Sequence, residues 1–226
     1  ATTLHHKPSP LPDNTMRTIL LTLLLFTGVP LHAQDRPNIV WIIPDDMSAH
    51  FSSYGETAIQ TPNVDKLAAK GVKFTNAYVT APVCSTCRSA FITGMYQTSI
   101  GAHHHRSGRG EKKIHLPESM KLVPKHFQEA GYHTSISGGP NRNWKLGKTD
   151  YNFEWDKSIY DGADWSERQE GQPFFAQIQT AGGKLRGKDA NGWEKVARDA
   201  EKAFGKRTPI SAVKLPPYYP NHPDIV

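Results

Sequence analysis

The only two cysteines of the chain, Cys84 and Cys87, lie three residues apart, and Arg88 follows directly. An apolar, strand-like stretch, residues 72–79, precedes them, and Arg88 opens a short predicted helix that ends at Gly94. Cys84 is therefore expected in a turn between a strand and a helix. A nucleophile at that position meets unpaired backbone N–H groups and the positive end of the helix dipole.

The Cys-x-x-Cys spacing also fits two other kinds of site. A zinc ribbon needs a second pair of cysteines, which the sequence lacks, so structural zinc is disfavoured. A thiol–disulfide exchange pair formed by Cys84 and Cys87 suits the loosely βαβ-like surroundings, and this alternative stays open.

A second candidate group is the carboxylate pair Asp45 and Asp46, which follows Pro44 and the apolar run of residues 38–43. Such a continuous run predicts a strand in a parallel sheet covered on both faces. Ligands bind beyond the carboxyl ends of strands in these sheets. Adjacent carboxylates repel each other unless a cation lies near them, and their hard oxygen atoms favour Ca²⁺ or Mg²⁺. A metal-free Asx-type turn is the alternative.

The segment around Cys84 resembles the signature of the formylglycine-dependent sulfatases of the alkaline-phosphatase superfamily. In that signature a Cys or Ser is followed two positions later by Pro or Ala, four positions later by Arg, and then by an apolar turn and Thr-Gly. Cys84, Thr86, Arg88 and Thr93-Gly94 occupy these positions here. The phrases that begin at Thr61, Glu129 and Pro173 are also similar to the family, and the resemblance covers about residues 36–226.

This resemblance implies an α/β sandwich of alkaline-phosphatase type, with a largely parallel central sheet and helices on both faces. It implies that a formylglycine-generating enzyme oxidises Cys84 to formylglycine, and that Asp45, Asp46 and residue 84 bind Ca²⁺. Arg88 would assist the nucleophile and Lys148 would neutralise the sulfate. The family has a histidine where this sequence has Asp150.

The implied activity is hydrolysis of a sulfate ester, with a sulfated small molecule or polysaccharide as substrate. One hydroxyl of hydrated formylglycine attacks sulfur as the alcohol leaves, and the other then loses its proton so that sulfate departs and the aldehyde returns. The alternatives are a phosphoesterase of the same superfamily, and a sulfated-glycan-binding protein without activity. The family's downstream metal ligands and second lysine have no candidates in this chain, so the 226-residue chain is expected to be inactive by itself.

Three consecutive histidines, His103, His104 and His105, are expected in a polar loop near the pocket, because adjacent side chains point in different directions and rarely bind one ion. Lys184 offers a basic group after the predicted strand at residues 172–179. Further elements are a strand at residues 132–136 and two helices. The helix of residues 61–71 is expected to bury Val64, Leu67 and Ala68. Residues 116–131 are expected to be helical, with a fresh helix that starts at Pro124, ends at Gly131 and buries Phe127 and Ala130.

Composition and the N-terminal residues limit the protein class. The chain has 226 residues, 37% of them hydrophobic, with 18 Gly and 17 Pro, which is typical of a loop-rich α/β protein. Its net charge of +6 weakly favours an anionic substrate, and no basic stripe interleaved with aromatic residues indicates nucleic-acid binding.

Residues 16–33 are predicted to be a secretory signal peptide, because a positive start precedes an apolar run too short to span a membrane. Residues 1–15 resemble upstream translated sequence, and residues 34–226 are the expected N-terminal portion of the catalytic domain. A periplasmic or secreted protein, with no membrane segment after signal cleavage, is therefore expected.

Overall fold

The computed structural model describes residues 36–139, 143, 145–180, 182, 192–220 and 222. The chain separates into two compact units, Ala1–Pro37 and Asn38–Val226, and all described secondary structure lies in the second. The predicted signal peptide and Lys184 lie outside the described residues. Within those residues, no helix is both long and apolar enough to cross a membrane.

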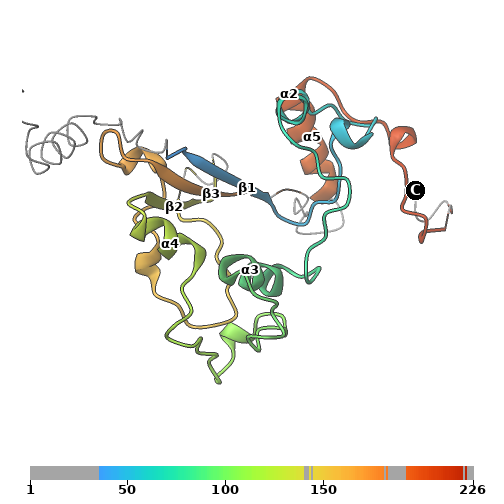
Figure 1. Ribbon diagram of the computed structural model, residues 1–226. Coiled ribbons are helices and arrows are strands. Elements are labelled where there is room, and N and C mark those ends of the chain that lie inside the picture. The colour runs from blue at the N-terminus through green and yellow to red at the C-terminus, as the bar shows by residue number, and fades with distance from the viewer. Residues whose placement is uncertain are drawn as a thin grey trace, which may run out of the picture. The chain divides into compact units, whose positions relative to one another are not determined.

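A three-stranded parallel sheet forms the centre of the second unit (Figure 1). Its strands are β1 (Ile39–Pro44), β2 (His133–Ser137) and β3 (Phe174–Thr180), in the order β1-β3-β2. Gln177 of β3 lies opposite both Trp41 of β1 and Ile136 of β2. The predicted parallel sheet is thus confirmed, and the carboxyl ends of all three strands meet at one edge.

Helices α3 (Cys84–Thr93) and α4 (Val123–Glu129) pack on the same face of this sheet (Figure 1). The ring of Phe91 in α3 lies 5.6 Å from that of Trp41, and Phe127 of α4 stacks on Phe175 at 4.3 Å. The buried hydrophobic core continues on this side, through Ile92, Leu122, Ile136, Tyr151, Phe153, Ile159 and Tyr160.

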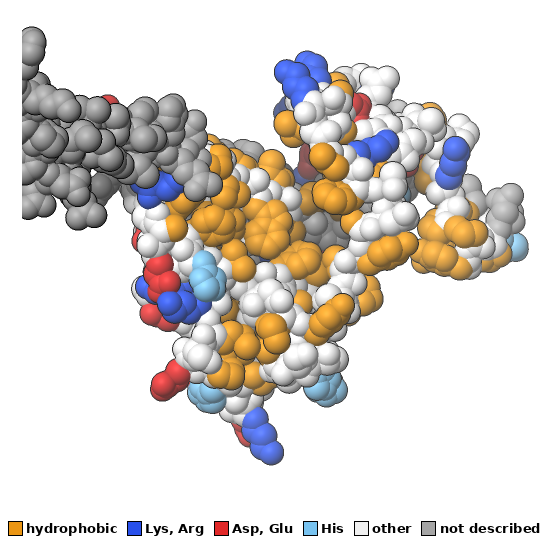
Figure 2. All heavy atoms as spheres, in the orientation of Figure 1, with side chains coloured by type: hydrophobic (Ala, Val, Ile, Leu, Met, Phe, Trp, Pro, Cys, Tyr) orange, Lys and Arg blue, Asp and Glu red, His pale blue; other side chains and the backbone are white. Residues whose placement is uncertain are grey.

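On the opposite face of β1, Val40 and Ile42 are 51% and 54% exposed. Figure 2 shows a group of hydrophobic side chains on the side of the molecule that carries β1. Helices on both faces were expected, whereas in the described part of the chain the helices packed on the sheet, α3 and α4, cover one face. Because side chains alternate between the two faces of a strand, Val40 and Ile42 point to the face that no described helix covers.

The remaining described helices lie between these elements or after them in the chain. They are η1 (Ser52–Tyr54), α2 (Pro62–Lys70), η2 (Ser107–Arg109), η4 (Lys157–Ile159), η5 (Trp165–Glu167), α5 (Gly192–Phe204) and η6 (Ile210–Ala212). Helix α2 contacts η1, where Ser52 Oγ donates to Asp65 Oδ2 at 2.6 Å.

Three local predictions were wrong. Residues 72–79 form no strand, and Phe74 and Tyr78 are 68% and 89% exposed. Leu67 of α2 is 68% exposed, because α2 packs on a small 3₁₀ turn and has no buried residue. Residues 116–122 are not helical and Ala130 is exposed, whereas the helix predicted to start at Pro124 begins at Val123 and its Phe127 packs as expected. In each case the local sequence pattern does not determine which other part of the chain the segment packs against.

Candidate active site

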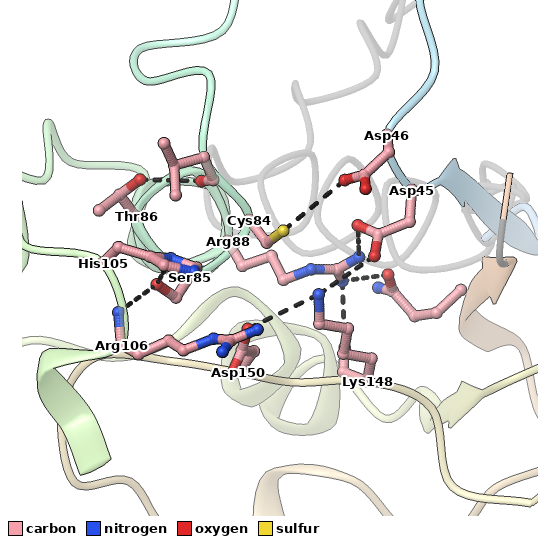
Figure 3. Close-up of polar contacts among 12 residues, drawn as sticks. Asp45, Asp46, Cys84, Ser85, Thr86, Arg88, His105, Arg106, Lys148 and Asp150 are labelled. Carbon is pink, nitrogen blue, oxygen red and sulfur yellow. Dashed lines mark hydrogen bonds and ion pairs between the residues drawn. The ribbon is translucent and has the colours of Figure 1, made fainter. Parts of the chain in front are cut away.

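The N-terminus of α3 lies beside the carboxyl end of β1, and this places Cys84 against the two aspartates (Figure 3). Val83 is the extended N-cap, so Cys84 is the first helical residue and does not lie in the preceding turn. Cys84 Sγ donates to Asp46 Oδ1 at 3.8 Å. One ligand atom from each of Asp45, Asp46 and Cys84 lies within 4.8 Å of the others.

Arg88 joins the helix to the sheet. It follows Cys84 by one helical turn, so the two side chains lie on the same side of α3. Arg88 is 5% exposed and its Nη2 donates to Asp45 Oδ1 at 2.9 Å. Its Nη1 donates to the Lys148 backbone carbonyl at 3.0 Å and also to Gln179 Oε1 of β3. The buried guanidinium therefore connects α3, β1, β3 and the loop that carries Lys148.

Lys148 reaches the same carboxylate from the other side. Its Nζ donates to Asp45 Oδ2 at 3.1 Å and lies 3.6 Å from Asp150 Oδ2. The side chain is 28% exposed, so the ammonium group is accessible from solvent. All five residues predicted to form the site thus lie together, although they come from segments about 100 positions apart in sequence (Figure 3).

The donor atoms of this cluster suit a hard divalent cation. Each oxygen of Asp45 accepts a hydrogen bond from Arg88 or Lys148, and a carboxylate oxygen has a further lone pair for a metal ion. Asp46 is exposed and its backbone has φ 49°. Two carboxylates supply part of the six to eight oxygen atoms that Ca²⁺ takes, and an oxygen at residue 84 would suit it better than sulfur.

Cys87 differs from Cys84 in its surroundings. Burial raises the pKa of the Cys87 thiol, against a smaller lowering by Arg88. Both cysteines are free thiols. A thiol whose pKa is raised is a weak nucleophile at neutral pH, so the exchange pair gains no support from these surroundings.

Residues 102–110 supply contacts that the sequence analysis did not assign. Ser85 is fully buried next to Cys84, and its Oγ lies 3.0 Å from His105 Nδ1 and accepts from the Arg106 backbone N–H at 2.8 Å. The histidine-rich segment therefore lies beside the site, as expected for a loop near the pocket. A buried serine at the second position of a helix could have indicated such a contact.

The family model described as Sulfatase matches residues 37–198. The chain is 36% identical over 158 residues to the ulvan-active sulfatase of Formosa agariphila. This alignment covers 65% of the chain and 25% of that protein. It is 33% identical over 151 residues to human steryl-sulfatase, and this alignment covers 62% of the chain and 25% of that protein. It is 34% identical over 116 residues to the N-acetylgalactosamine-6-O-sulfatase of Bacteroides thetaiotaomicron, with 50% and 21% covered.

Two solved structures share the fold. A protein in complex with its substrate D-glucosamine-2-N,6-O-disulfate has a TM-score of 0.51 at 19% identity, over 66% of this chain and 35% of that chain. Ps i-CgsB in complex with k-i-k-neocarrahexaose has a TM-score of 0.50 at 21% identity, over 69% of this chain and 47% of that chain. The parallel sheet with its helices is therefore of the alkaline-phosphatase-like type. The chain spans about a quarter of the length of the curated relatives.

Proposed function

The chain belongs to the sulfatase family, and from this premise we propose that the whole protein hydrolyses a sulfate ester with residue 84 as its nucleophile. The observation that carries the proposal is the meeting of Cys84, Arg88 and Lys148 around Asp45 at the carboxyl edge of the sheet. Cations gathered at a helix N-terminus are suited to bind an anion and to stabilise charge on an attacking oxygen.

We propose that Cys84 is converted to formylglycine by a maturation enzyme. The hydrated aldehyde would supply two hydroxyl groups on one carbon, one to attack sulfur and one whose loss of a proton releases sulfate. The first turn of α3 directs backbone N–H groups and the positive end of its dipole toward this position. Arg88 adds a fixed positive charge one turn away, and its contacts with Asp45 and Gln179 hold it in place.

Lys148 has the role of the sulfate-binding cation. Its ammonium group carries three N–H donors, and one of them is engaged by Asp45 Oδ2. The remaining donors are available to sulfate oxygens, since the side chain is partly exposed. Asp45 therefore orients two cations. Arg88 is held one helical turn after the nucleophile, and Lys148 is held where it can contact the substrate.

Ca²⁺ is the metal that we propose for the site. Asp45, Asp46 and the oxygen of the modified residue 84 would hold it, together with ligands from further along the whole protein. When bound, the ion would supply Lewis-acid stabilisation of negative charge at the attacking oxygen.

The substrate that we propose is a sulfated carbohydrate. Relatives named for ulvan and for N-acetylgalactosamine 6-O-sulfate support this class, as does the substrate D-glucosamine-2-N,6-O-disulfate of a structural neighbour. A periplasmic or secreted location is proposed from Met16 and the apolar residues 19–29.

The test is to coexpress the whole protein with a formylglycine-generating enzyme, analyse the peptide that contains residue 84 by mass spectrometry, and assay aryl sulfate turnover. We expect conversion of thiol to aldehyde at residue 84, no turnover in Cys84→Ala, and largely retained turnover in Cys87→Ala. Aldehyde at residue 87, or a Cys84–Cys87 disulfide in the active protein, would contradict the assignment. Preferential hydrolysis of an aryl phosphate would favour the phosphoesterase alternative instead.

A further inference from the structure

Asp150 is a buried carboxylate to which the proposed reaction assigns no task. Its side chain is 7% exposed, and its Oδ1 accepts from Arg109 Nη2 at 2.9 Å. Its Oδ2 is buried without a hydrogen-bond partner and lies 3.6 Å from Lys148 Nζ. The backbone of Asp150 has φ 52°, in the left-handed region that residues other than glycine rarely adopt. Such strain persists where surrounding contacts hold the residue in place, and it is common at binding sites.

Asp150 extends a series of charges that alternate in sign from the buried site to the surface. The order is Arg88, Asp45, Lys148, Asp150 and Arg109, with closest separations of 2.9, 3.1, 3.6 and 2.9 Å. The Arg88 side chain is buried at the inner end, whereas the Arg109 side chain is 63% exposed at the outer end. Each carboxylate of the series lies between two cations, so the series carries a net positive charge.

The loop that carries Arg109 is held on two sides. Ser85 Oγ accepts from the Arg106 backbone N–H at 2.8 Å, and Figure 3 shows Ser85 and Arg106 joined beside α3. Asn152 Nδ2 donates to the backbone carbonyls of residues 102 and 104 at 2.9 and 2.8 Å. A Cβ atom on Gly108 would lie 2.6 Å from the Tyr151 backbone carbonyl oxygen, so the loop lies directly against residues 151–152. Arg109 is therefore presented from a fixed backbone.

A guanidinium group offers five N–H donors in a plane, and it binds sulfate or carboxylate oxygens in pairs. Asp150 engages Nη2 of Arg109, and the high exposure of the side chain leaves other donors facing solvent. A cation that is already oriented loses little conformational entropy when an anion binds. Arg109 is also only two ion pairs away from Lys148, through Asp150, which is close enough for one substrate to contact both side chains.

We propose that Arg109 binds a second anionic group of the substrate, and that Asp150 is the residue that positions it. The substrate class is then a sulfate ester that bears another sulfate or a carboxylate near the scissile group. This inference rests on the proposed function, because it takes Lys148 as the group that contacts the scissile sulfate.

The test measures binding by calorimetry at fixed ionic strength, in a Cys84→Ala background of the whole protein so that no ligand is consumed. The probes are α,ω-alkanediol disulfates of increasing spacer length, ω-carboxyalkyl sulfates, and the corresponding monosulfates as reference. We expect at least one dianionic probe to bind about ten-fold more tightly than its monosulfate. Whether the disulfates or the carboxyalkyl sulfates bind more tightly identifies the second group as sulfate or carboxylate.

Arg109→Gln should reduce this preference to less than about two-fold, because it removes the positive charge and the planar fork of donors while keeping a polar side chain. Arg109→Lys should restore part of the preference. Asp150→Asn keeps a residue type that tolerates positive φ, and it should weaken the preference by freeing Arg109. Arg207→Gln is the matched control, since Arg207 is a partly exposed arginine paired with Glu194, and the preference should not change.

Wild-type binding of monosulfates with no preference for any dianionic probe would overturn this inference alone. An unchanged preference in Arg109→Gln would do the same. A protein that binds neither monosulfates nor dianionic probes would overturn the proposed function, and the inference with it.

Discussion

Asp45 is the residue on which the site depends most, because Arg88 and Lys148 each bind one of its oxygens in a largely buried position. Breaking a buried ion pair by removing one partner leaves an uncompensated charge. Arg88→Met should therefore lower the free energy of unfolding by about 3 kcal/mol. Urea-induced unfolding checks this value. The double variant Asp45→Asn/Arg88→Met should cost less than the two single changes added together, and strict additivity would contradict a direct coupling.

Asp46 offers a separate test of the proposed metal. Asp46→Asn keeps the size of the side chain and suits φ 49°, so the fold should be preserved while one anionic ligand is lost. We expect the affinity for Ca²⁺ to fall at least about ten-fold, and kcat of the matured whole protein to fall by about two orders of magnitude. Calorimetry and aryl sulfate turnover measure the two effects. Asp199→Asn, at an exposed aspartate paired with Lys195, is the control. Unchanged Ca²⁺ affinity in Asp46→Asn would leave Asp45 and Asp46 as a turn.

At the scale of residues, the sequence predicted the central cluster but not its outer part. Asp45, Asp46, Cys84, Arg88 and Lys148 could be named because each belongs to a short motif with recognisable neighbours. The contacts of Ser85 with residues 105–106, and of Arg109 with Asp150, join segments that have no common motif. Such pairs depend on how the loops pass each other in space, and the spacing along the chain does not contain that information.

At the scale of elements, two tyrosines tie the loop after the site to the sheet. Tyr151 and Tyr160 share a hydrogen bond of 2.7 Å between their hydroxyl groups, and Tyr160 donates to Gln177 of β3. Burial raises the pKa of Tyr151 to about 12, and burial also raises the pKa of Tyr160. Both hydroxyls therefore stay protonated in the folded protein at a pH where the unfolded chain begins to ionise.

The raised pKa of Tyr151 makes the folded protein less stable at alkaline pH. Above about pH 10 the unfolded state releases the tyrosine proton while the folded state keeps it, so stability falls as pH rises toward 12. Tyr151 alone contributes about 3 kcal/mol that is lost over this range. Tyr151→Phe should lose less stability than the wild type between pH 9 and pH 11.5, as measured by urea unfolding at each pH. Tyr78→Phe, at an 89% exposed position, should follow the wild type. Parallel curves for Tyr151→Phe and wild type would contradict the assigned burial effect.

Gly108 tests whether the loop of residues 102–110 is held by close packing. A Cβ atom there would lie 2.6 Å from the Tyr151 carbonyl oxygen and 3.1 Å from Asn152 Cα, and backbone atoms cannot move aside easily. Gly108→Ala should lower the free energy of unfolding by about 2 kcal/mol and increase hydrogen exchange in residues 102–110. Gly110→Ala is the control, because its added Cβ would approach the Ser107 carbonyl oxygen only to 3.3 Å. Equal exchange in the two variants would contradict this packing.

Elements were predicted well where burial decides them. Strand β1 follows from a continuous apolar run and α3 from a helix ended by Gly94, whose φ is 67°. Residues 72–79 also contain several apolar residues yet form no strand, because a strand also needs a neighbour to pair with. Their apolar side chains indicate that they could pack against another hydrophobic surface, but they do not indicate whether such a surface lies nearby.

At the scale of the whole molecule, β1 combines an apolar sequence with limited cover. It lies at one end of the strand order β1-β3-β2, and among the described residues its pairing is with β3 alone. Val40 and Ile42 are more than half exposed on the face that α3 and α4 do not cover. An apolar strand at a sheet edge offers both unpaired backbone groups and a hydrophobic surface to another molecule.

We therefore expect the purified 226-residue chain to self-associate through β1 at micromolar concentrations, despite a net charge of +6. Val40→Glu and Ile42→Glu should each reduce this association, because a charge on the exposed face opposes burial while the core-facing positions Ile39, Trp41 and Ile43 are unchanged. Sedimentation velocity over a range of concentrations measures the effect, with Lys121→Glu on the surface of the molecule as a control for added negative charge. Equal association of the wild type and both β1 variants would locate the contact elsewhere. A strictly monomeric wild-type chain would show that β1 is protected, and other parts of the chain would then have to cover it.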